Sequence, residues 1–228
     1  MAEWSSYSPH DLLLFSLQAY FGLFELLNTT LWPVHLVTLA LSLAAALLVL
    51  TKHRARHRLV WALFCLLWLW TGWHFFHVQY AAINWAAEYV AVVFWLQGLL
   101  FGLFAVAPNC PQISYTGTVT DRMAAAAYLF AVIGYPIATL ALGRSSDSVE
   151  FLGISADPGV AATLAVLVLS RARFIWLSWV VPLAWCALTG LTLWLLESPE
   201  FLIAPLTAML AVVAAVTNSN RPLTPASK

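Results

Sequence analysis

The amino-acid sequence predicts an all-α fold, a polytopic bundle of membrane-spanning helices. Of its 228 residues, 62% are hydrophobic and only 9% are charged, whereas about 25% of the residues of an ordinary soluble domain are charged. The apolar residues fall in runs of about 20, the length that a helix needs to cross a bilayer. Low charge and 14% aromatic residues exclude a disordered chain. Because the net charge is zero, a nucleic-acid partner is not expected either.

Seven apolar runs account for most of the chain and are expected to span the membrane. They cover residues 32–50, 59–80, 89–107, 123–142, 158–170, 174–196 and 201–217. The fifth run is short, but it opens with Asp157-Pro158, which is typical of a helix start with Asp as the N-cap and Pro at the first helical position. We therefore expect one integral membrane domain over residues 1–228, with the transmembrane bundle at 32–217.

The N-terminal segment predicts a further helix that does not span. The sequence from Ser8 to Asp11 has a Ser cap, a Pro and an acid in the first turn, which indicates a helix start. The apolar run that follows, 12–27, is only about 16 residues long, which is too short to cross a bilayer without strain. We expect an amphipathic helix over 8–30 that lies at the outer interface of the membrane.

The positions of the charges predict an orientation. If the loop 52–58 is cytoplasmic, seven spans place nine of the ten basic residues on the cytoplasmic side and nine of the ten acidic residues outside. Only Arg144 and Asp121 depart from this separation. Because short cytoplasmic loops of membrane proteins are rich in Lys and Arg, we expect the N-terminus outside and a cytoplasmic tail at 218–228.

Polar side chains gather at the outer side of this topology. His74 and His77 are three residues apart and share one face of a helix, and His35 enters the first span from the same side. The full candidate cluster comprises Glu25, His35, His74, His77, Asn84, Glu88 and Asp157. Such groups bind divalent metals such as Zn or Cu, with His74 and His77 as the candidate ligands, or relay protons. They also serve as interface anchors and helix-to-helix hydrogen bonds, and no cofactor is predicted.

Deeper in the bundle the polar groups are few. They are Gln97, Tyr135, Cys186 and Thr189, together with Pro136 and Pro182. No charged residue is expected near the middle of a span. Gly98 and Gly102 form a G-x-x-x-G pattern, which permits close packing of helices. Because no catalytic motif is present, we do not expect an enzyme.

Three stretches of sequence carry a resemblance to a known family. They are YFGLFELLN at 20–28, YAAINWAA at 80–87 and FLGISADP at 151–158, with PLAWC at 182–186. Together they resemble a bacterial family of multi-pass membrane proteins, the domain of unknown function 6064. The resemblance implies an integral protein of the bacterial inner membrane without a catalytic residue, and some family members carry permease names. It also draws attention to Glu25, Asn84 and Asp157.

Three hypotheses for function follow. The first is a small permease-like or accessory protein that handles a small solute or ion through an outward-facing polar vestibule at the candidate cluster. The second is a membrane-embedded metal or redox subunit that uses the His residues. The third is a structural or assembly partner of a membrane complex. Besides the lipid bilayer, the expected partners are therefore a small solute or ion, a second copy of the chain or another membrane protein.

Overall fold

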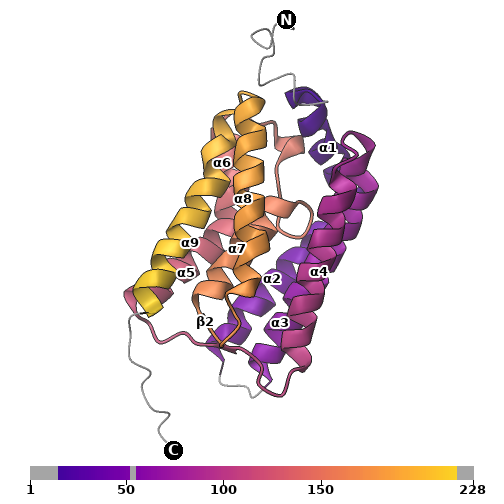
Figure 1. Ribbon diagram of the computed structural model, residues 1–228. Coiled ribbons are helices and arrows are strands. Elements are labelled where there is room, and N and C mark those ends of the chain that lie inside the picture. Colours follow the sequence, from indigo (N-terminus) through magenta and orange to yellow (C-terminus); the bar gives the residue numbers. More distant parts are fainter. Residues whose placement is uncertain (1–14, 52–54, 220–228) are drawn as a thin grey trace, which may run out of the picture.

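The protein is a bundle of long helices, as a computed structural model shows for residues 15–51 and 55–219 (Figure 1). The helices are α1 (Leu17–Thr30), α2 (Val34–Leu50), α3 (Arg56–Thr71), α4 (Ala87–Val106), α5 (Val119–Leu129), α6 (Tyr135–Ala141), α7 (Ala156–Val168), α8 (Leu177–Leu195) and α9 (Ile203–Ser219). Two short strands, β1 (Gln112–Ile113) and β2 (Ser170–Arg171), pair with each other. The all-α prediction is confirmed.

Several helices are prolonged by turns of different pitch. α3 continues as π-helix over Gly72–Gln79 and then as a 3₁₀ turn over Tyr80–Ala82. A π-helical stretch, Phe130–Gly134, joins α5 to α6, and a 3₁₀ turn, Pro199–Leu202, leads into α9. These joints keep the flanking segments continuous as single long rods.

Five of these rods are long and apolar enough to cross a membrane. They are Arg56–Ala82, Ala87–Val106, Val119–Ala141, Leu177–Leu195 and Pro199–Thr217. A sixth exists if α1 and α2, which meet at 90°, count as one broken span. Each of the five lies over one of the predicted runs, whereas α7, over the fifth run, is a shorter apolar helix. The exact count of seven spans stays a prediction.

The N-terminal helix begins later than predicted within the described residues. Phe15 and Ser16 are not helical, and the Ser16 hydroxyl accepts a hydrogen bond from the backbone N–H of Ala19, so Ser16 is the N-cap of α1. The predicted start at Ser8–Asp11 lies outside the described residues. Because α1 turns by 90° before α2, it runs across one end of the bundle.

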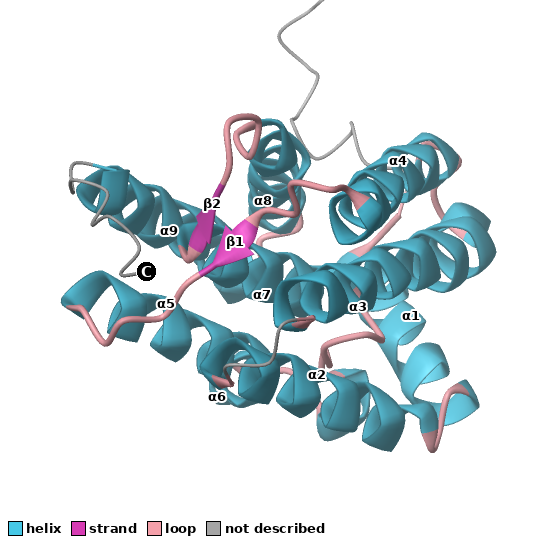
Figure 2. Cartoon of the chain, turned by 90° about the horizontal axis from the view of Figure 1, so that it is seen from below, coloured by secondary structure: helices cyan, strands magenta, loops and turns pink. Residues whose placement is uncertain are grey.

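α7 lies at the centre of the bundle, and the chain reaches it by an unusual route. β1 and β2 pair antiparallel, with Gln112 opposite Arg171. Since β1 precedes α5 and β2 precedes α8, both helices start from the same end, and the chain between them must cross the molecule. It crosses as a non-helical segment at 149–155, which turns at Gly153 and Ile154, followed by α7, all of whose residues are buried. Figures 1 and 2 show α7 surrounded by other helices.

A glycine lies in the turn of this non-helical segment. Gly153 has a φ of +85° and contacts α2 so closely that a Cβ would lie 2.6 Å from Cγ2 of Thr38. The indole nitrogen of Trp70 in α3 donates a hydrogen bond to its carbonyl oxygen (2.9 Å). The segment therefore contacts both α2 and α3 before α7 begins.

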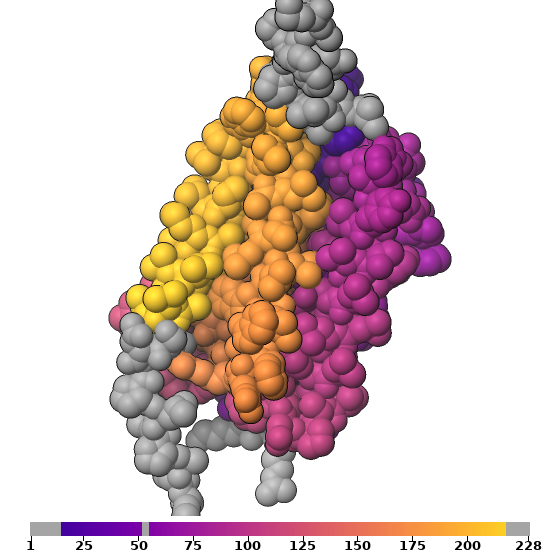
Figure 3. Space-filling view, in the orientation of Figure 1, coloured from indigo at the N-terminus to yellow at the C-terminus, as the bar shows by residue number. Residues whose placement is uncertain are grey.

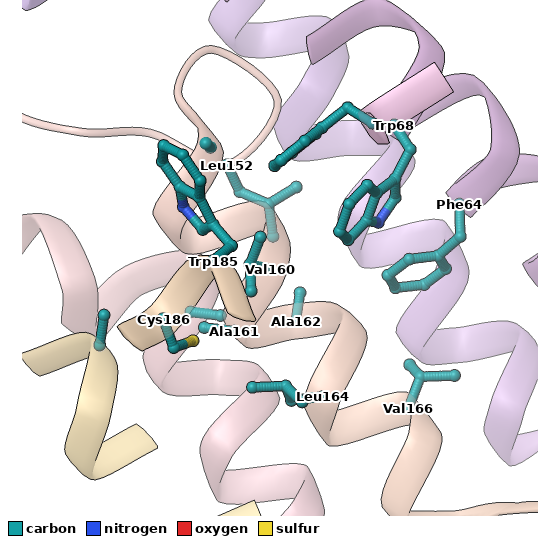
Figure 4. Close-up of a cluster of buried hydrophobic side chains, with 14 of the residues drawn as sticks. Phe64, Trp68, Leu152, Val160, Ala161, Ala162, Leu164, Val166, Trp185 and Cys186 are labelled. Atoms are coloured by element: carbon teal, nitrogen blue, oxygen red, sulfur yellow. The ribbon is translucent and has the colours of Figure 1, made fainter. Parts of the chain in front are cut away.

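Large aromatic residues fill the core around α7. Trp68 and Phe64 of α3 face α7, as Figure 4 shows, and the indole nitrogen of Trp68 donates to the Thr163 hydroxyl (2.8 Å). Gly98 of α4 lets α3 approach, because a Cβ there would lie 3.0 Å from Cγ of Leu69. The G-x-x-x-G pattern therefore serves packing between neighbouring helices of one chain.

The two ends of the bundle carry opposite charge. Five of the six described arginines lie at the end that holds β1, β2 and the starts of α3, α5 and α8, here called the basic end: Arg56, Arg58, Arg122, Arg171 and Arg173. Contacts between segments confirm this end as one surface, since Arg58 donates to the carbonyl oxygen of Ala107 (3.0 Å). Among the described residues Asp121 is the only acid there. The opposite, acidic end holds α1 and the residues that precede α4 and follow α8.

Candidate functional site

A carboxylate is buried inside the bundle at the first turn of α7. Asp157 is only 4% exposed. Its Oδ1 accepts hydrogen bonds from the indole nitrogen of Trp185 (2.6 Å) and the hydroxyl of Thr189 (3.0 Å), and its Oδ2 accepts one from the hydroxyl of Tyr135 (3.0 Å). All three partners can donate at once to an ionised carboxylate, which only accepts.

The donors come from two helices, α8 and α6, in which polar side chains are few. Trp185 and Thr189 are four residues apart on α8 and therefore share a face, while Tyr135 opens α6 directly after the π-helical stretch. Trp185 lies ten residues before Leu195, the end of α8, which corresponds to about 15 Å at 1.5 Å per residue. Asp157 is thus deep in the bundle, whereas its place in the sequence predicted the outer side. The non-helical segment at 149–155 causes the difference, because it carries the chain inward before α7 starts.

A buried ion-pair group joins the segment that leads to Asp157 to the 3₁₀ turn before α9. Arg144 donates from Nη1 to Oε1 of Glu150 (2.9 Å) and from Nε to Oε1 of Glu200 (2.9 Å), and its Nη2 also contacts Oε2 of Glu200. The side chains of all three are at most 3% exposed. The guanidinium also lies over the rings of Phe21 (4.3 Å) and Phe24 (4.9 Å) in α1. The two-pronged contact with Glu200 is the geometry that Arg favours with carboxylates.

The charges in this region do not balance. Three carboxylates, those of Glu150, Asp157 and Glu200, accompany one guanidinium, that of Arg144. Burial lowers the pKa of Arg144, but the adjacent Glu150 and Glu200 raise it to a net value above the ordinary one, so the guanidinium stays charged. Burial, and then the charge of Asp157, raise the pKa of Glu150 against the opposing effect of Arg144. We call these four residues, with Tyr135, Trp185 and Thr189, the buried polar centre.

The predicted outer cluster is distributed over several places. Nδ1 of His77 lies 2.7 Å from Oε2 of Glu88, and both side chains are half-exposed. Asn84 lies between them in sequence, where its Oδ1 accepts a hydrogen bond from the backbone N–H of Ala86 (3.1 Å) and shapes the turn before α4. These three residues therefore share the turn between α3 and α4.

The other members of the cluster lie apart from this pair. Nε2 of His35 lies 3.1 Å from Oδ1 of Asn28, whose Nδ2 donates to the carbonyl oxygens of Asp147 and Val149 (2.8 Å each). The ring of His74 packs beside that of Trp70, with 5.1 Å between the ring centroids. The side chain of Glu25 is exposed on α1. Of the predicted residues, the structure joins His77 with Glu88, ties His35 through Asn28 to the segment at 147–149, and holds Asp157 inside.

Metal-ligating groups are sparse in the part of the chain that the structure describes. No group of three or more His, Cys, Asp or Glu side chains is placed there to hold a metal ion. His77 and Glu88 offer two ligands, and His74 faces an indole instead. The cysteines Cys65, Cys110 and Cys186 are free thiols.

Four members of the buried polar centre were not predicted as site residues: Arg144, Glu150, Trp185 and Glu200. One signal was available, because Arg144 is the sole basic residue on the acidic side of the predicted topology and so needs acidic partners there. Tyr135 and Thr189 were noticed as polar residues within spans. Their common partner, Asp157, is recognised only in the structure, where the non-helical segment at 149–155 brings it to their depth.

Comparison with known proteins gives one match. A family described as a family of unknown function, DUF6064, matches residues 17–224. No curated protein and no solved structure matches the chain. The match covers all nine helices of the described residues.

Proposed function

The chain belongs to the family of unknown function DUF6064, and on that premise we propose from its geometry that it is a permease-like membrane protein that moves a small cation. The observation that carries the proposal is Asp157, a carboxylate buried at the start of a broken, central segment and surrounded by apolar helices. An ionisable residue within a membrane bundle is costly to bury, and such residues mark ion and substrate pathways.

The break in the central segment supports the same proposal. Non-helical backbone at membrane depth is tolerated where protein surrounds it or where it lines a polar path. Transporters build ion sites from helices that are interrupted in this way. Here residues 149–155 are not helical and contain a turn at Gly153 and Ile154, α7 is a half-length helix, and Asp157 lies where the two meet.

The charge inventory of the buried polar centre favours a cation. With every group ionised, Glu150, Asp157 and Glu200 outnumber Arg144 by two negative charges. Unpaired charges in a low-dielectric interior are strongly unfavourable. A bound proton or small cation would reduce this imbalance, whereas an anion would increase it.

The centre is closed in this conformation, so transport requires an opening movement. The helices around it contain irregular turns that are suited to this. The π-helical stretch Phe130–Gly134 directly precedes Tyr135, and Pro182 interrupts the hydrogen bonds of α8 before Trp185. The π-helical part of α3 brings Phe76 against Trp185, with 4.8 Å between the ring centroids.

Reconstitution into liposomes tests the proposal. Vesicles that contain the protein are adsorbed to a solid-supported electrode and exposed in turn to steps of H⁺, Na⁺, K⁺ and methylammonium concentration. We expect a charge movement for one of these cations, its loss in Asp157→Asn, and its retention in Asp147→Asn, which alters an exposed acid at the acidic end. No response of the folded protein to any of the four cations, or an unchanged response in Asp157→Asn, would overturn the proposal.

A structural role is the second candidate, and one observation favours it. Each oxygen of Asp157 already has a donor from another element, so the carboxylate also fastens α6, α7 and α8 together. In that case Asp157→Asn lowers the stability of the bundle, and no cation produces a charge movement in the unmodified protein.

For location, we propose the bacterial inner membrane with the basic end in the cytoplasm and the acidic end outside. The separation of charge between the ends of the bundle supports this orientation. Under it, α1 lies at the outer interface and the buried polar centre is closer to the outer side.

A further inference from the structure

An apolar groove runs between α2 and α5 toward the basic end of the bundle. It encloses about 270 Å³. Its α2 wall includes Leu43, Ala46 and Leu50, and its α5 wall includes Ala125 and Tyr128. The hydroxyl of Tyr128 donates to the carbonyl oxygen of Ser42 (2.8 Å), so the polar atom of this side chain is already bonded within the protein. The walls therefore suit a hydrocarbon chain.

Two arginines flank the groove where it reaches the basic end. On one side, the groove ends at Leu50, and Arg56 contacts the carbonyl oxygen of the next residue, Thr51. On the other side, Arg122 lies one turn before Ala125 on α5, and its Nε donates to the carbonyl oxygen of Gly117 (3.1 Å). Arg122 is exposed. A positive charge thus lies beyond each wall of the groove.

The nearby acid does not neutralise these charges by pairing with them. Oδ2 of Asp121 accepts hydrogen bonds from the backbone N–H and the hydroxyl of Thr116 (2.8 Å each) and from the backbone N–H of Thr118 (3.1 Å). Asp121 is only 4% exposed, and its carboxylate completes the capping box of α5, whose N-cap is Thr118. The surface at this end of the groove is therefore positive.

We propose that the groove binds one anionic phospholipid, with an acyl chain between α2 and α5 and the phosphate at Arg56 and Arg122. Charge complementarity selects this occupant, because Arg pairs with phosphate oxygens and basic residues at the membrane surface attract anionic lipids. The length also fits. The span from Leu43 to Leu50 is seven residues, about 10 Å, which is within the roughly 15 Å depth of one leaflet.

Thermal unfolding of the full chain in detergent tests the headgroup contact. The midpoint is measured with added phosphatidylglycerol and with phosphatidylcholine of the same acyl chains. We expect phosphatidylglycerol to raise the midpoint by several degrees and phosphatidylcholine to raise it by less than half as much. The double variant Arg56→Gln, Arg122→Gln should lose most of the difference, measured against its own lipid-free midpoint. Arg173→Gln, which removes an exposed arginine beside Phe174 and away from the groove, should keep it.

A second pair of variants tests the groove itself. Ala125→Trp fills the groove from an exposed position and should abolish the shift by phosphatidylglycerol, whereas Ala187→Trp, on an exposed site of α8, should not. Equal shifts by both lipids would overturn the proposal, as would an equal loss in Arg173→Gln. A change from dimer to monomer in Ala125→Trp would overturn it in favour of a second copy of the chain as the occupant.

Discussion

The indole nitrogen of Trp185 donates a 2.6 Å hydrogen bond to Oδ1 of Asp157, and this contact joins the middle of α8 to the first turn of α7. The Trp185 ring also meets Phe76 and Phe94 edge to face. Aromatic packing therefore fixes the donor, and the fixed donor orients the carboxylate. The relationship explains how a charged group is accommodated among apolar helices.

Replacing Asp157 by Ala should strongly destabilise the bundle. The change leaves Trp185, Thr189 and Tyr135 as buried donors without their acceptor, and each such donor costs about 1–3 kcal/mol. We expect a loss of about 3 kcal/mol or more in the free energy of unfolding, measured by denaturant titration in mixed micelles. Asp147→Ala, which changes an exposed acid at the acidic end, should change this free energy by about 0.5 kcal/mol or less. Equal effects of the two variants would show that the three bonds carry little energy.

The ion-pair group should behave as a unit. Arg144→Met removes the only guanidinium beside Glu150 and Glu200, and breaking a buried pair from one side costs about 3–5 kcal/mol. The triple variant Arg144→Met, Glu150→Gln, Glu200→Gln removes the charges together and should be more stable than Arg144→Met alone. The same unfolding titration measures both. A triple variant less stable than the single one would mean that the glutamates contribute independently of the arginine.

The sequence allowed most of the fold to be predicted, because apolar runs of membrane length leave few alternatives. The predicted run 174–196 and the observed α8 at Leu177–Leu195 differ by at most three residues at either end. The short fifth run was also located, and α7 begins at Ala156 instead of Pro158. Helix starts outside the membrane-length runs were predicted less well, since the cap at Ser16 carries no hydrophobic signal.

The site could not be predicted to the same degree, because it depends on contacts between distant segments. Arg144 and Glu200 are 56 positions apart, and nothing in their local sequence indicates that they pair. Asp157 was identified as a helix start and as part of an outer cluster. Its position inside the bundle follows from the non-helical residues 149–155, which hydropathy cannot distinguish from a loop at the surface.

Two glycines should respond in opposite ways to substitution by Ala. At Gly190 of α8 an added Cβ would lie 2.4 Å from Cγ of Pro205 in α9, so the two helices would have to separate. We expect Gly190→Ala to cost about 1–3 kcal/mol, the typical penalty of overpacking. At Gly22 of α1 nothing lies within 4 Å of the added Cβ, so Gly22→Ala should stabilise by about 0.5–1 kcal/mol through helix propensity. Unfolding midpoints of the two variants check this, and a stabilising Gly190→Ala would contradict the close contact of α8 with α9.

The orientation in the membrane is open to a direct test with reporter fusions. A periplasm-active reporter such as alkaline phosphatase is fused after Ser146, which lies at the acidic end, and after the C-terminus, while a cytoplasm-active fluorescent protein is fused at the same two sites. Because Arg56, Arg58 and Arg122 lie at the opposite end from Ser146, the positive-inside rule places Ser146 outside. We expect phosphatase activity from the Ser146 fusion and fluorescence from the C-terminal one. An active phosphatase at the C-terminus together with one at Ser146 would mean that the chain between them crosses an even number of times. In that case α7 would not complete a crossing of the membrane, although it crosses the bundle.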